Sequence, residues 1–442
     1  MKYPRVMISA QSSGSGKTTV TCGILQALAN RGLKLSSFKC GPDYIDPMFH
    51  SKVIGAKSRN LDPYFVDGDM LRYLFSRSAE GSDISIIEGA MGFYDGSSYS
   101  QPDHSSCDVS LQTKTPVILI VDGRGSSLSA AAVLKGFLDF HDNLIKGVIF
   151  NRMSKTVYEG VAPVARSMGV TPIGYIPKMK DVILESRHLG LVMPGEIDDI
   201  RDKLNKVAEM FEETLDIDAI IELSKTAEEL DIKEPEIPKM DKVRVGLADD
   251  DAFCFTYEDN IELLQRMGAE IVRFSPLKDD KLPDVDALIL SGGYPELHAE
   301  GLSGNKSMMR SVRDAIADGM PCIAECGGFM YLHERMEGAD GKMYETCGAI
   351  KGETRNMQKL TRFGYITLTP KDPSLGTVKG HEFHHWDSDN CGTDWKAENR
   401  KGKSYECIHD DGRIIAGYPH LYYYSNPKIA QEIIRRALAY RS

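Results

Sequence analysis

Short runs of hydrophobic residues alternate with longer amphipathic stretches along the first half of the chain. The runs are RVMIS at 5–9, DISIIEG at 83–89, PVILIVD at 116–122, GVIFN at 147–151 and PIGYIP at 172–177. Runs this short and continuous are typical of strands buried on both faces, and the stretches between them have the longer period of helices. The pattern predicts an α/β fold with a doubly wound, mostly parallel sheet that helices cover on both faces.

A second series of the same kind begins after a linker. Residues 201–231 have the pattern of a charged amphipathic helix, and residues 232–242, IKEPEIPKMDK, combine prolines and charges with little periodicity. New hydrophobic runs follow at 243–248, 269–275, 285–293 and 321–328. Because 442 residues exceed the size at which one hydrophobic core keeps growing, we expect two tandem α/β domains, 1–238 and 239–442, with the linker at the end of the first.

Composition and charge exclude several classes of protein. The net charge of -11 argues against a nucleic-acid surface, which needs clustered Lys and Arg. No apolar run is long enough to span a bilayer, and the N-terminus runs directly into a predicted strand instead of a signal peptide. The nine cysteines lack close CxxC pairs, so neither a disulfide framework nor a zinc site is indicated. We therefore expect a cytoplasmic protein that binds neither nucleic acid nor membrane.

The segment AQSSGSGKTT at residues 10–19 connects the first predicted strand to the first predicted helix. A glycine-rich loop in this position turns its backbone N–H groups toward a phosphate, as in nucleotide-binding P-loops. Gln11 stands where the usual pattern has its first glycine, which affects only the first turn of the loop. A glycine-rich helix cap is the alternative. The residues expected to hold ATP are Gly14, Gly16, Lys17, Thr18 and Thr19, with the Thr18 hydroxyl available to Mg2+.

Charged residues cluster after two further predicted strands. Lys39, Asp43 and Asp46 lie within eight residues, and Glu88 ends the strand ISIIE with Asp95 in the loop behind it. Carboxylates near a triphosphate are unfavourable unless they hold Mg2+ or orient an acceptor, and ligands of open parallel sheets bind at the carboxyl edge. We expect Lys39 to contact the phosphates and Glu88 to bind Mg2+. Turns that contain the two Asp residues, and a cap at Glu88, are the alternatives.

Four motifs, GSGKTT, FKCGPDYIDP, EGAMGFYDG and ESRHLGL, together resemble the cobyrinic acid a,c-diamide synthase family, and the similarity continues to the C-terminus. The first half is also similar to dethiobiotin synthetase. The resemblance implies that ATP phosphorylates a substrate carboxylate and that ammonia from glutamine then displaces the phosphate. It further implies that Lys17 and Thr18 bind phosphate and magnesium, that Asp43 and Asp46 form an acidic loop that handles magnesium and the acceptor, and that Asp95 lies near the acceptor. Tyr44 and Ile45 would help to choose which side chain reacts, and Asn151 would contact the adenine. Arg187 and His188 would bind a carboxylate-rich tetrapyrrole.

The second half carries the pattern of a class I glutamine amidotransferase. Cys326 lies between an apolar strand and a predicted helix, where Gly327 permits a sharp turn and the helix N-terminus favours a thiolate. Such a thiolate can attack the glutamine amide, with Gly292, Gly293 and Gly327 as expected oxyanion donors. His420 matches the family's histidine and is the expected base. No acidic third member follows His420, which leaves open what orients its ring.

Several residues, and the function itself, have more than one interpretation. By composition, His381, His384 and His385 would suggest a metal site, whereas the resemblance makes them a structural or substrate loop. Ser12 stands where partition-type ATPases carry a second lysine, which argues against their nucleotide-sandwich dimer and leaves room for another homodimer. Arg59, Arg355 and Arg362 are further candidate contacts to substrate carboxylates. The expected product is cobyrinic acid a,c-diamide; nickel sirohydrochlorin a,c-diamide synthase, cobyric acid synthase and a non-catalytic nucleotide switch are the rival functions.

Overall fold

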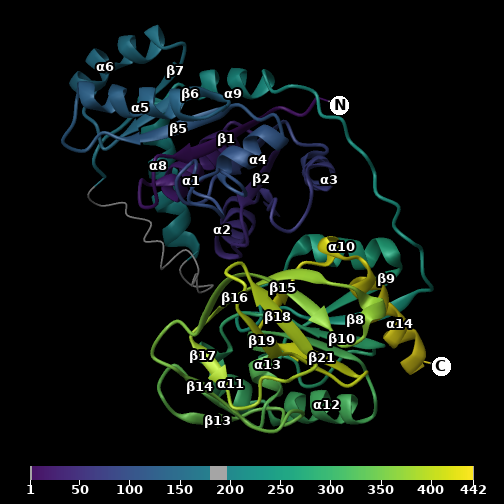
Figure 1. The fold of residues 1–442 in the computed structure, drawn as a ribbon. Helices are drawn as coiled ribbons and strands as arrows, with labels where there is room; N and C mark the ends of the chain where they lie inside the picture. Colours follow the sequence, from purple (N-terminus) through teal and green to yellow (C-terminus); the bar gives the residue numbers. More distant parts are fainter. Residues whose placement is uncertain (1, 180–196, 442) are drawn as a thin grey trace. The chain divides into compact units, whose positions relative to one another are not determined.

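The computed structural model describes residues 2–179 and 197–441 (Figure 1). The chain divides into two compact units, residues 1–235 and 236–442. Each unit contains its own central sheet and its own hydrophobic core. The predicted two-domain α/β architecture, with a parallel sheet in the first half, is confirmed.

The first unit is built on a sheet of parallel strands in the order β3-β2-β4-β1-β5-β6-β7. The strands are β1 (Arg5–Ala10), β2 (Leu35–Cys40), β3 (Lys57–Leu61), β4 (Ile84–Glu88), β5 (Val117–Asp122), β6 (Ile145–Asn151) and β7 (Thr171–Ile176). β1 is entirely buried and lies between β4 and β5. Its carboxyl end, together with the ends of β2 and β4, is therefore the edge at which this fold binds ligands.

Helices connect these strands and cover the sheet. They are α1 (Lys17–Asn30), α2 (Ile45–Phe49), the π-helical turn η1 (His50–Ile54), α3 (Gly68–Ala79), α4 (Ser106–Gln112), α5 (Leu128–Phe140), α6 (Lys155–Ser167), α8 (Ile197–Thr214) and α9 (Ile217–Lys225). One core cluster joins the sheet to α1, α8 and α9. α1 and α8 pack so closely that a side chain at Gly23 would overlap the ring of Phe211.

The single long helix expected over residues 201–231 is wrong in one respect. The structure has two helices, because the chain turns at Leu215, which forms an isolated bridge with Gly174 on β7. Asp216 then caps α9 by accepting a hydrogen bond from the backbone N–H of Ala219, at 2.8 Å. A short polar residue at an N-cap starts a new helix at this point, and a charge pattern alone does not show such a break.

Arg5 fastens the start of β1 to two neighbouring segments. Its side chain is fully buried and donates to the carbonyl oxygens of Tyr3, Thr113, Lys114 and Glu228 at 2.7 to 3.1 Å. The carbonyls of Thr113 and Lys114 precede β5, that of Glu228 follows α9, and that of Tyr3 precedes β1 itself. A planar guanidinium with five N–H groups can satisfy several carbonyls at once, which explains a cation in the interior of the unit.

The second unit contains a sheet in the order β20-β21-β11-β10-β8-β9, parallel except for β20. Its strands are β8 (Val243–Ala248), β9 (Ala269–Phe274), β10 (Ala287–Leu290), β11 (Cys322–Glu325), β20 (His409–Asp410) and β21 (Ile414–Gly417). The helices of the unit are α10 (Glu258–Met267), η3 (Pro295–His298), α11 (Ala299–Gly304), α12 (Lys306–Ala317), α13 (Gly327–Leu332), η4 (Pro373–Leu375), η5 (Tyr423–Ser425) and α14 (Lys428–Arg441).

Two smaller sheets complete this unit. The first has the order β19-β18-β15-β16-β22 and is antiparallel, and the second has the order β13-β12-β14-β17. Their strands are β12 (Arg335–Glu337), β13 (Met343–Glu345), β14 (Glu353–Asn356), β15 (Arg362–Pro370), β16 (Val378–His384), β17 (Trp386–Ser388), β18 (Trp395–Asn399), β19 (Ser404–Cys407) and β22 (His420–Leu421). These strands come from the stretch between Cys326 and His420, so they separate the two residues in sequence and not in space.

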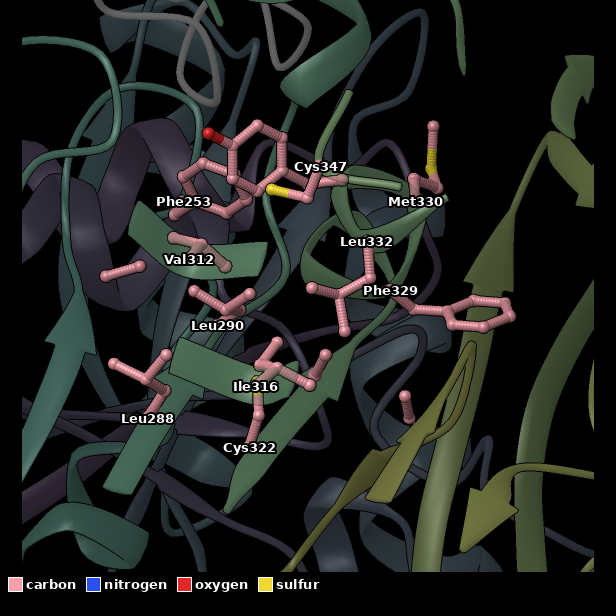
Figure 2. Close-up of a cluster of buried hydrophobic side chains, with 14 of the residues drawn as sticks. Phe253, Leu288, Leu290, Val312, Ile316, Cys322, Phe329, Met330, Leu332 and Cys347 are labelled. Atoms are coloured by element: carbon pink, nitrogen blue, oxygen red, sulfur yellow. The ribbon is translucent and has the colours of Figure 1, made fainter. Parts of the chain in front are cut away.

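The core of the second unit lies against the loop that carries Cys326. Figure 2 shows Leu288 and Leu290 of β10 and Cys322 of β11 beside Phe329 and Leu332 of α13. Each of these side chains is buried, and Cys326 belongs to the same cluster. Burying one such side chain stabilises a fold by about 1.5–3 kcal/mol. The strand before Cys326 and the helix after it are thus both fixed by packing.

Candidate active sites

The P-loop of the first unit wraps around the start of α1. Gly14 and Gly16 have φ angles of 75° and 91°, in the left-handed region that favours glycine. A Cβ atom on Gly16 would lie 2.7 Å from Nδ2 of Asn151, so this position also excludes a side chain. Nζ of Lys17 donates to the carbonyl oxygens of Ser12, at 3.2 Å, and Met91. Burial and the nearby charge of Lys39 lower the pKa of Lys17 to about 8.

Residues outside the P-loop motif hold the loop in place. Oε1 of Gln11 accepts a hydrogen bond from the backbone N–H of Asp122 at the end of β5, at 3.3 Å. Arg152 binds Asp122 at 2.7 Å and donates to the carbonyl oxygen of Gly14 at 3.0 Å. The glutamine that replaces the usual glycine therefore has a structural use. The sequence did not point to Arg152, because it lies far from the P-loop motif. It follows β6, the neighbour of the strand β5 that ends at Asp122.

Asn151 and the start of α1 lie at the same edge. Nδ2 of Asn151 donates to the carbonyl oxygen of Ser15 at 2.8 Å, and its Oδ1 accepts from the backbone N–H of Arg152. The side chain therefore supports the P-loop, and its contact with an adenine stays a prediction. Thr19 is half-buried in the first turn of α1.

The ends of β2 and β4 form an acidic centre next to Lys17. Glu88 is fully buried, and its Oε1 accepts from the hydroxyl of Thr18 at 2.8 Å and from Nζ of Lys39 at 2.8 Å. Lys39 also pairs with Asp46. Nε2 of His50, a fully buried residue of η1, lies 3.5 Å from Oε2 of Glu88. His50 was not singled out from the sequence, since a histidine after a proline-broken turn carries no distinctive signal.

The two buried carboxylates of this centre differ in protonation. Burial disfavours charge on Glu88, but Lys39 and His50 outweigh burial and hold its pKa below the ordinary value. Burial and the charge of Glu88 instead raise the pKa of Asp46 to about 8, against the opposing effect of Lys39. The surroundings therefore favour the anion at Glu88 and disfavour it at Asp46.

The acidic loop between β2 and α2 is built around Asp43. Oδ1 of Asp43 accepts from the backbone N–H groups of Ile45, at 2.8 Å, and Asp46, at 3.4 Å, so it caps the short helix α2. Nδ2 of Asn60 on β3 donates to the carbonyl oxygens of Gly41, at 2.8 Å, and Asp43, at 2.7 Å. The turn interpretation of Asp43 thus has structural support, and Asn60 is an unpredicted residue that holds the loop.

The remaining predicted residues of this unit occupy varied settings. Tyr44 is buried, and Ile45 packs against a small core cluster that includes Cys22 and Phe49. Oδ2 of Asp95 accepts from the backbone N–H of Gly92 at 3.0 Å and contributes to the field at Lys17. Arg187 and His188, in the motif ESRHLGL, lie outside the described residues. Their contact with substrate, like that of Tyr44 and Ile45, stays a prediction.

The pair Thr18 and Glu88 fits a magnesium ion. Mg2+ is usually held by one or two protein groups, with phosphate oxygens and water completing its shell. A hydroxyl and a buried carboxylate that touch each other at the start of a P-loop helix supply such a partial shell. Asp43 fits less well because one of its oxygens is engaged by the backbone. Within residues 2–179 and 197–441, no three His, Cys, Asp or Glu side chains gather into a closed metal site, and this includes the histidines of β16.

In the second unit, Cys326 lies on a strained turn between β11 and α13. Its φ of 48° and ψ of -102° are rare for a residue with a side chain, and strain of this kind is typical of a nucleophile elbow. The backbone N–H of Cys326 donates to the carbonyl oxygen of Gly417 at 2.8 Å, which fixes the turn against β21. Cys326 is buried, with 7% of the residue exposed.

His420 and Glu325 lie beside this cysteine. Nδ1 of His420 is 3.6 Å from Oε2 of Glu325, whose other oxygen accepts from the backbone N–H of Leu421 at 3.2 Å. Burial lowers the pKa of His420, but hydrogen bonds to Cys326 and Glu325 outweigh burial and raise it to about 10. The sequence left open what orients His420. A carboxylate lies beside its ring, and it comes from the residue before the cysteine instead of from one that follows the histidine.

The predicted oxyanion glycines come together at the same point. A side chain on Gly292 would overlap the His420 ring, and a Cβ on Gly327 would lie 3.1 Å from the backbone nitrogen of Gly293. The loop after β10 and the start of α13 thus approach each other next to Cys326. This places backbone N–H groups near the nucleophile, as an oxyanion site requires, and their role stays a prediction.

Comparisons with known proteins agree with both sites. Residues 6–192 match the CobQ/CobB/MinD/ParA nucleotide binding domain, and residues 244–428 match the CobB/CobQ-like glutamine amidotransferase domain. A cobyrinate a,c-diamide synthase of Listeria innocua is 38% identical over 97% of this chain and 98% of its own length. The chain belongs to the cobyrinate a,c-diamide synthase family. The predicted family, and the class of carbon–nitrogen ligases with a glutamine amidotransferase domain, are confirmed.

Other members of the family show the same extent of similarity. The cobyrinate a,c-diamide synthase of Listeria monocytogenes is 39% identical over 96% of this chain and 97% of its own length. The cobyrinate a,c-diamide synthase of Priestia megaterium is 36% identical over 99% of this chain and 98% of its own length. The solved structure of a glutamine amidotransferase aligns over 44% of this chain and 98% of its own chain, at 16% sequence identity. Its TM-score of 0.33 is too low to support a conclusion. Among the described helices, none has the length and apolar character needed to cross a membrane.

Proposed function

We propose that this chain uses ATP and glutamine to amidate the a and c acetate side chains of cobyrinic acid. One observation carries the proposal: the same chain holds a P-loop with a buried carboxylate and, in its other unit, a cysteine paired with a histidine and a glutamate. The choice of substrate is supported by cobyrinate a,c-diamide synthases that match 96% and 97% of this chain. We assign activation of the carboxylate to residues 1–238 and release of nitrogen to residues 239–442.

Nitrogen release begins at Cys326. Its thiolate attacks the side-chain carbonyl carbon of glutamine, and the backbone N–H groups around Gly293 and Gly327 stabilise the oxygen anion that forms. His420, protonated at neutral pH, gives its proton to the departing nitrogen, which leaves as ammonia. Water then attacks the resulting thioester, His420 takes a proton from this water, and glutamate leaves as the sulfur is freed. Glu325 orients the ring and stabilises its charge throughout.

Carboxylate activation takes place at the P-loop. Lys17 and the loop N–H groups hold the β- and γ-phosphates of ATP. Lys39, which donates to Glu88, adds a second positive charge at this phosphate site. Thr18 and Glu88 would hold Mg2+, which would supply neutralising charge to the phosphates. A carboxylate oxygen of the substrate attacks the γ-phosphorus and ADP leaves; ammonia then attacks the acyl carbon and phosphate leaves. The acyl phosphate is needed because an ionised oxygen is a poor leaving group.

Both activities benefit from being on one chain. Ammonia is mostly protonated at neutral pH and diffuses away, and the acyl phosphate is open to hydrolysis. Tethering raises the effective concentration of ammonia where it is used. The substrates are therefore ATP, glutamine and a tetrapyrrole with several carboxylates, and the predicted contacts of Arg187 and His188 belong to this proposal.

A parallel incubation tests the proposal. Protein, Mg-ATP and glutamine are mixed with cobyrinic acid in one sample and with nickel sirohydrochlorin in another, and the products are weighed by mass spectrometry. We expect two carboxyl-to-amide conversions of cobyrinic acid, with ADP and glutamate formed in step. Amidation of the nickel compound alone would favour the rival synthase, and ATP binding without turnover in either sample would favour the nucleotide switch.

A further inference from the structure

A cluster of buried polar side chains next to Cys326 has no role in the reaction described so far. It contains Arg362 on β15, Glu382 and His384 on β16, and Tyr418 before β22. Each has a buried side-chain atom without a hydrogen-bond partner among residues 2–179 and 197–441, namely Nη1, Oε1, Nε2 and Oη. Oε1 of Glu382 lies 3.6 Å from Nη1 of Arg362 and 3.9 Å from Nε2 of His384. Buried polar atoms usually find partners, so a cluster of four suggests that a ligand supplies them.

This cluster is continuous with the glutaminase residues. His384 stacks on Tyr418, with ring centroids 3.9 Å apart and planes at 6°. The charge of Cys326 and that of Arg362 both act on Tyr418, and His420 acts on Glu382. Tyr418 also contacts Phe329 of α13, the helix that follows Cys326, with ring centroids 5.2 Å apart. A molecule attached at Cys326 would therefore lie close to these four residues.

The inner part of the cluster presents two acceptors. Nδ1 of His384 lies 2.6 Å from the carbonyl oxygen of Trp386, so it carries the hydrogen and Nε2 is left as an acceptor. Burial lowers the pKa of His384 to about 4, which keeps the ring neutral. Glu382 is only 2% exposed, and its second oxygen accepts from the hydroxyl of Tyr405. These two acceptors lie 3.9 Å apart, and Nη1 of Arg362 stands 3.6 Å from Oε1, longer than a hydrogen bond, so the pair suits an ammonium group.

The outer part presents a cation. The Arg362 side chain is 26% exposed, and its guanidinium lies over the ring of Tyr405, 4.1 Å from the centroid. Stacking on the ring fixes the plane of the guanidinium and leaves N–H groups at its edge. Such an edge can bind a carboxylate through two parallel N–H···O hydrogen bonds, in the bidentate geometry. Arg362 was a candidate contact to the carboxylates of the tetrapyrrole, but its setting in the second unit, beside Glu382, fits a smaller partner better.

We propose that this cluster binds the α-amino-acid head of glutamine, with Glu382 and His384 on the α-ammonium group and Arg362 on the α-carboxylate. The proposal rests on the proposed glutaminase function of Cys326 and names how that site recognises its substrate. A zwitterion matches a cluster that holds one carboxylate, one neutral acceptor and one cation.

Substrate analogues combined with variants test this assignment. The substrates are glutamine, 4-carbamoylbutanoate, which lacks the α-amino group, and 4-aminobutanamide, which lacks the α-carboxylate. Because a charge-assisted hydrogen bond is involved, we expect E382Q to lower kcat/KM for glutamine about ten- to a hundredfold, mainly through KM. The same variant should leave 4-carbamoylbutanoate unchanged. R362Q should show the converse pattern, with 4-aminobutanamide unchanged.

Controls separate this inference from other failures. K306Q and E345Q alter an exposed ion pair of 2.6 Å between α12 and β13 in the same unit and should leave all three substrates unaffected. Equal losses with glutamine and both analogues would overturn the inference, because a structural role affects them alike. If E382Q does not fold, calorimetry on full-length C326S, with and without E382D, compares the binding of glutamine with that of 4-carbamoylbutanoate. Equal binding of the two compounds would overturn the inference. The proposed function fails separately, if the parent protein makes no amide from ammonium and ATP.

Discussion

Glu325 and His420 lie 3.6 Å apart, although 95 positions separate them in the sequence. Glu325 immediately precedes the nucleophile Cys326, and the other oxygen of its carboxylate is held by the backbone of Leu421. One strand end therefore supplies both the sulfur and the carboxylate, and the histidine comes from β22. This arrangement answers how the imidazole is oriented in a chain with no acidic residue soon after the histidine.

E325Q should reduce glutamine-dependent ammonia release about tenfold or more while synthesis from ammonium continues. His420 must carry a proton for the departing nitrogen, and its pKa of about 10 is raised in part by Glu325. Removing the carboxylate lowers this pKa, so activity should be lost at a lower pH as the solution becomes alkaline. The measurement is the pH profile of kcat/KM for glutamine hydrolysis.

E334Q is the matched control for this change. Glu334 likewise accepts from a backbone N–H, that of Gly352 at 3.0 Å, but it is exposed. Its profile should match that of the parent. If E325Q slows the reaction and leaves the alkaline limb in place, Glu325 acts only through the Leu421 backbone, and the proposed effect on His420 is wrong.

R152M should raise the KM for ATP about tenfold, because the P-loop loses its hydrogen bond to the carbonyl of Gly14. R124M provides a control. Arg124 pairs with the same carboxylate oxygen of Asp122, at 3.1 Å, but makes no contact with the loop among the described residues. Steady-state kinetics of both variants should separate the two roles. Equal changes in KM would show that charge near Asp122 matters, and not the brace on Gly14.

N60A should lower the rate of ATP-dependent amidation about tenfold, since Asn60 holds the carbonyl oxygens of Gly41 and Asp43 and so fixes the acidic loop. Glutamine hydrolysis in the other unit should be unaffected. N30A, at an exposed position of α1, is the control. Product formation with ammonium as nitrogen donor is the readout, and an unchanged rate would remove Asn60 from the positioning of this loop.

R5M should destabilise the first unit by about 3 kcal/mol, because buried carbonyl groups lose their donor. R31M tests whether any lost arginine has this effect. Arg31 pairs with Glu212 and Asp218 at 2.6 Å but lies at the surface, where ion pairs contribute at most about 1 kcal/mol. Hydrogen exchange of the β1 amides in increasing urea measures both. A similar cost for the two variants would refute the role given to Arg5.

The repeating pattern of apolar runs was sufficient to predict two α/β halves and the strand-loop-helix setting of Lys17 and Cys326. Strand order was not predictable, because only tertiary pairing decides that β1 lies between β4 and β5. Glu88 could be predicted since it ends a buried strand at the carboxyl edge. Its partners His50 and Thr18 approach it from different elements, and only Thr18 carried a motif.

The residues that sequence analysis missed share one property. Glu325, Arg152 and Asn60 act on groups far away in the chain, through single hydrogen bonds or ion pairs at strand ends. Hydrophobic periodicity reports which face a residue occupies and says nothing of its polar partners. For Asp43 the two interpretations are not exclusive, since its carboxylate caps α2 and also lies in the acidic loop.

The central claim is that sulfur at Cys326 releases the nitrogen and that the site at Lys17 activates the carboxylate. The most direct measurement is the mass of the tetrapyrrole recovered from C326S supplied with Mg-ATP and either glutamine or ammonium. The account predicts diamide with ammonium and unchanged cobyrinic acid with glutamine. Diamide formed from glutamine at the rate of the parent protein would contradict it.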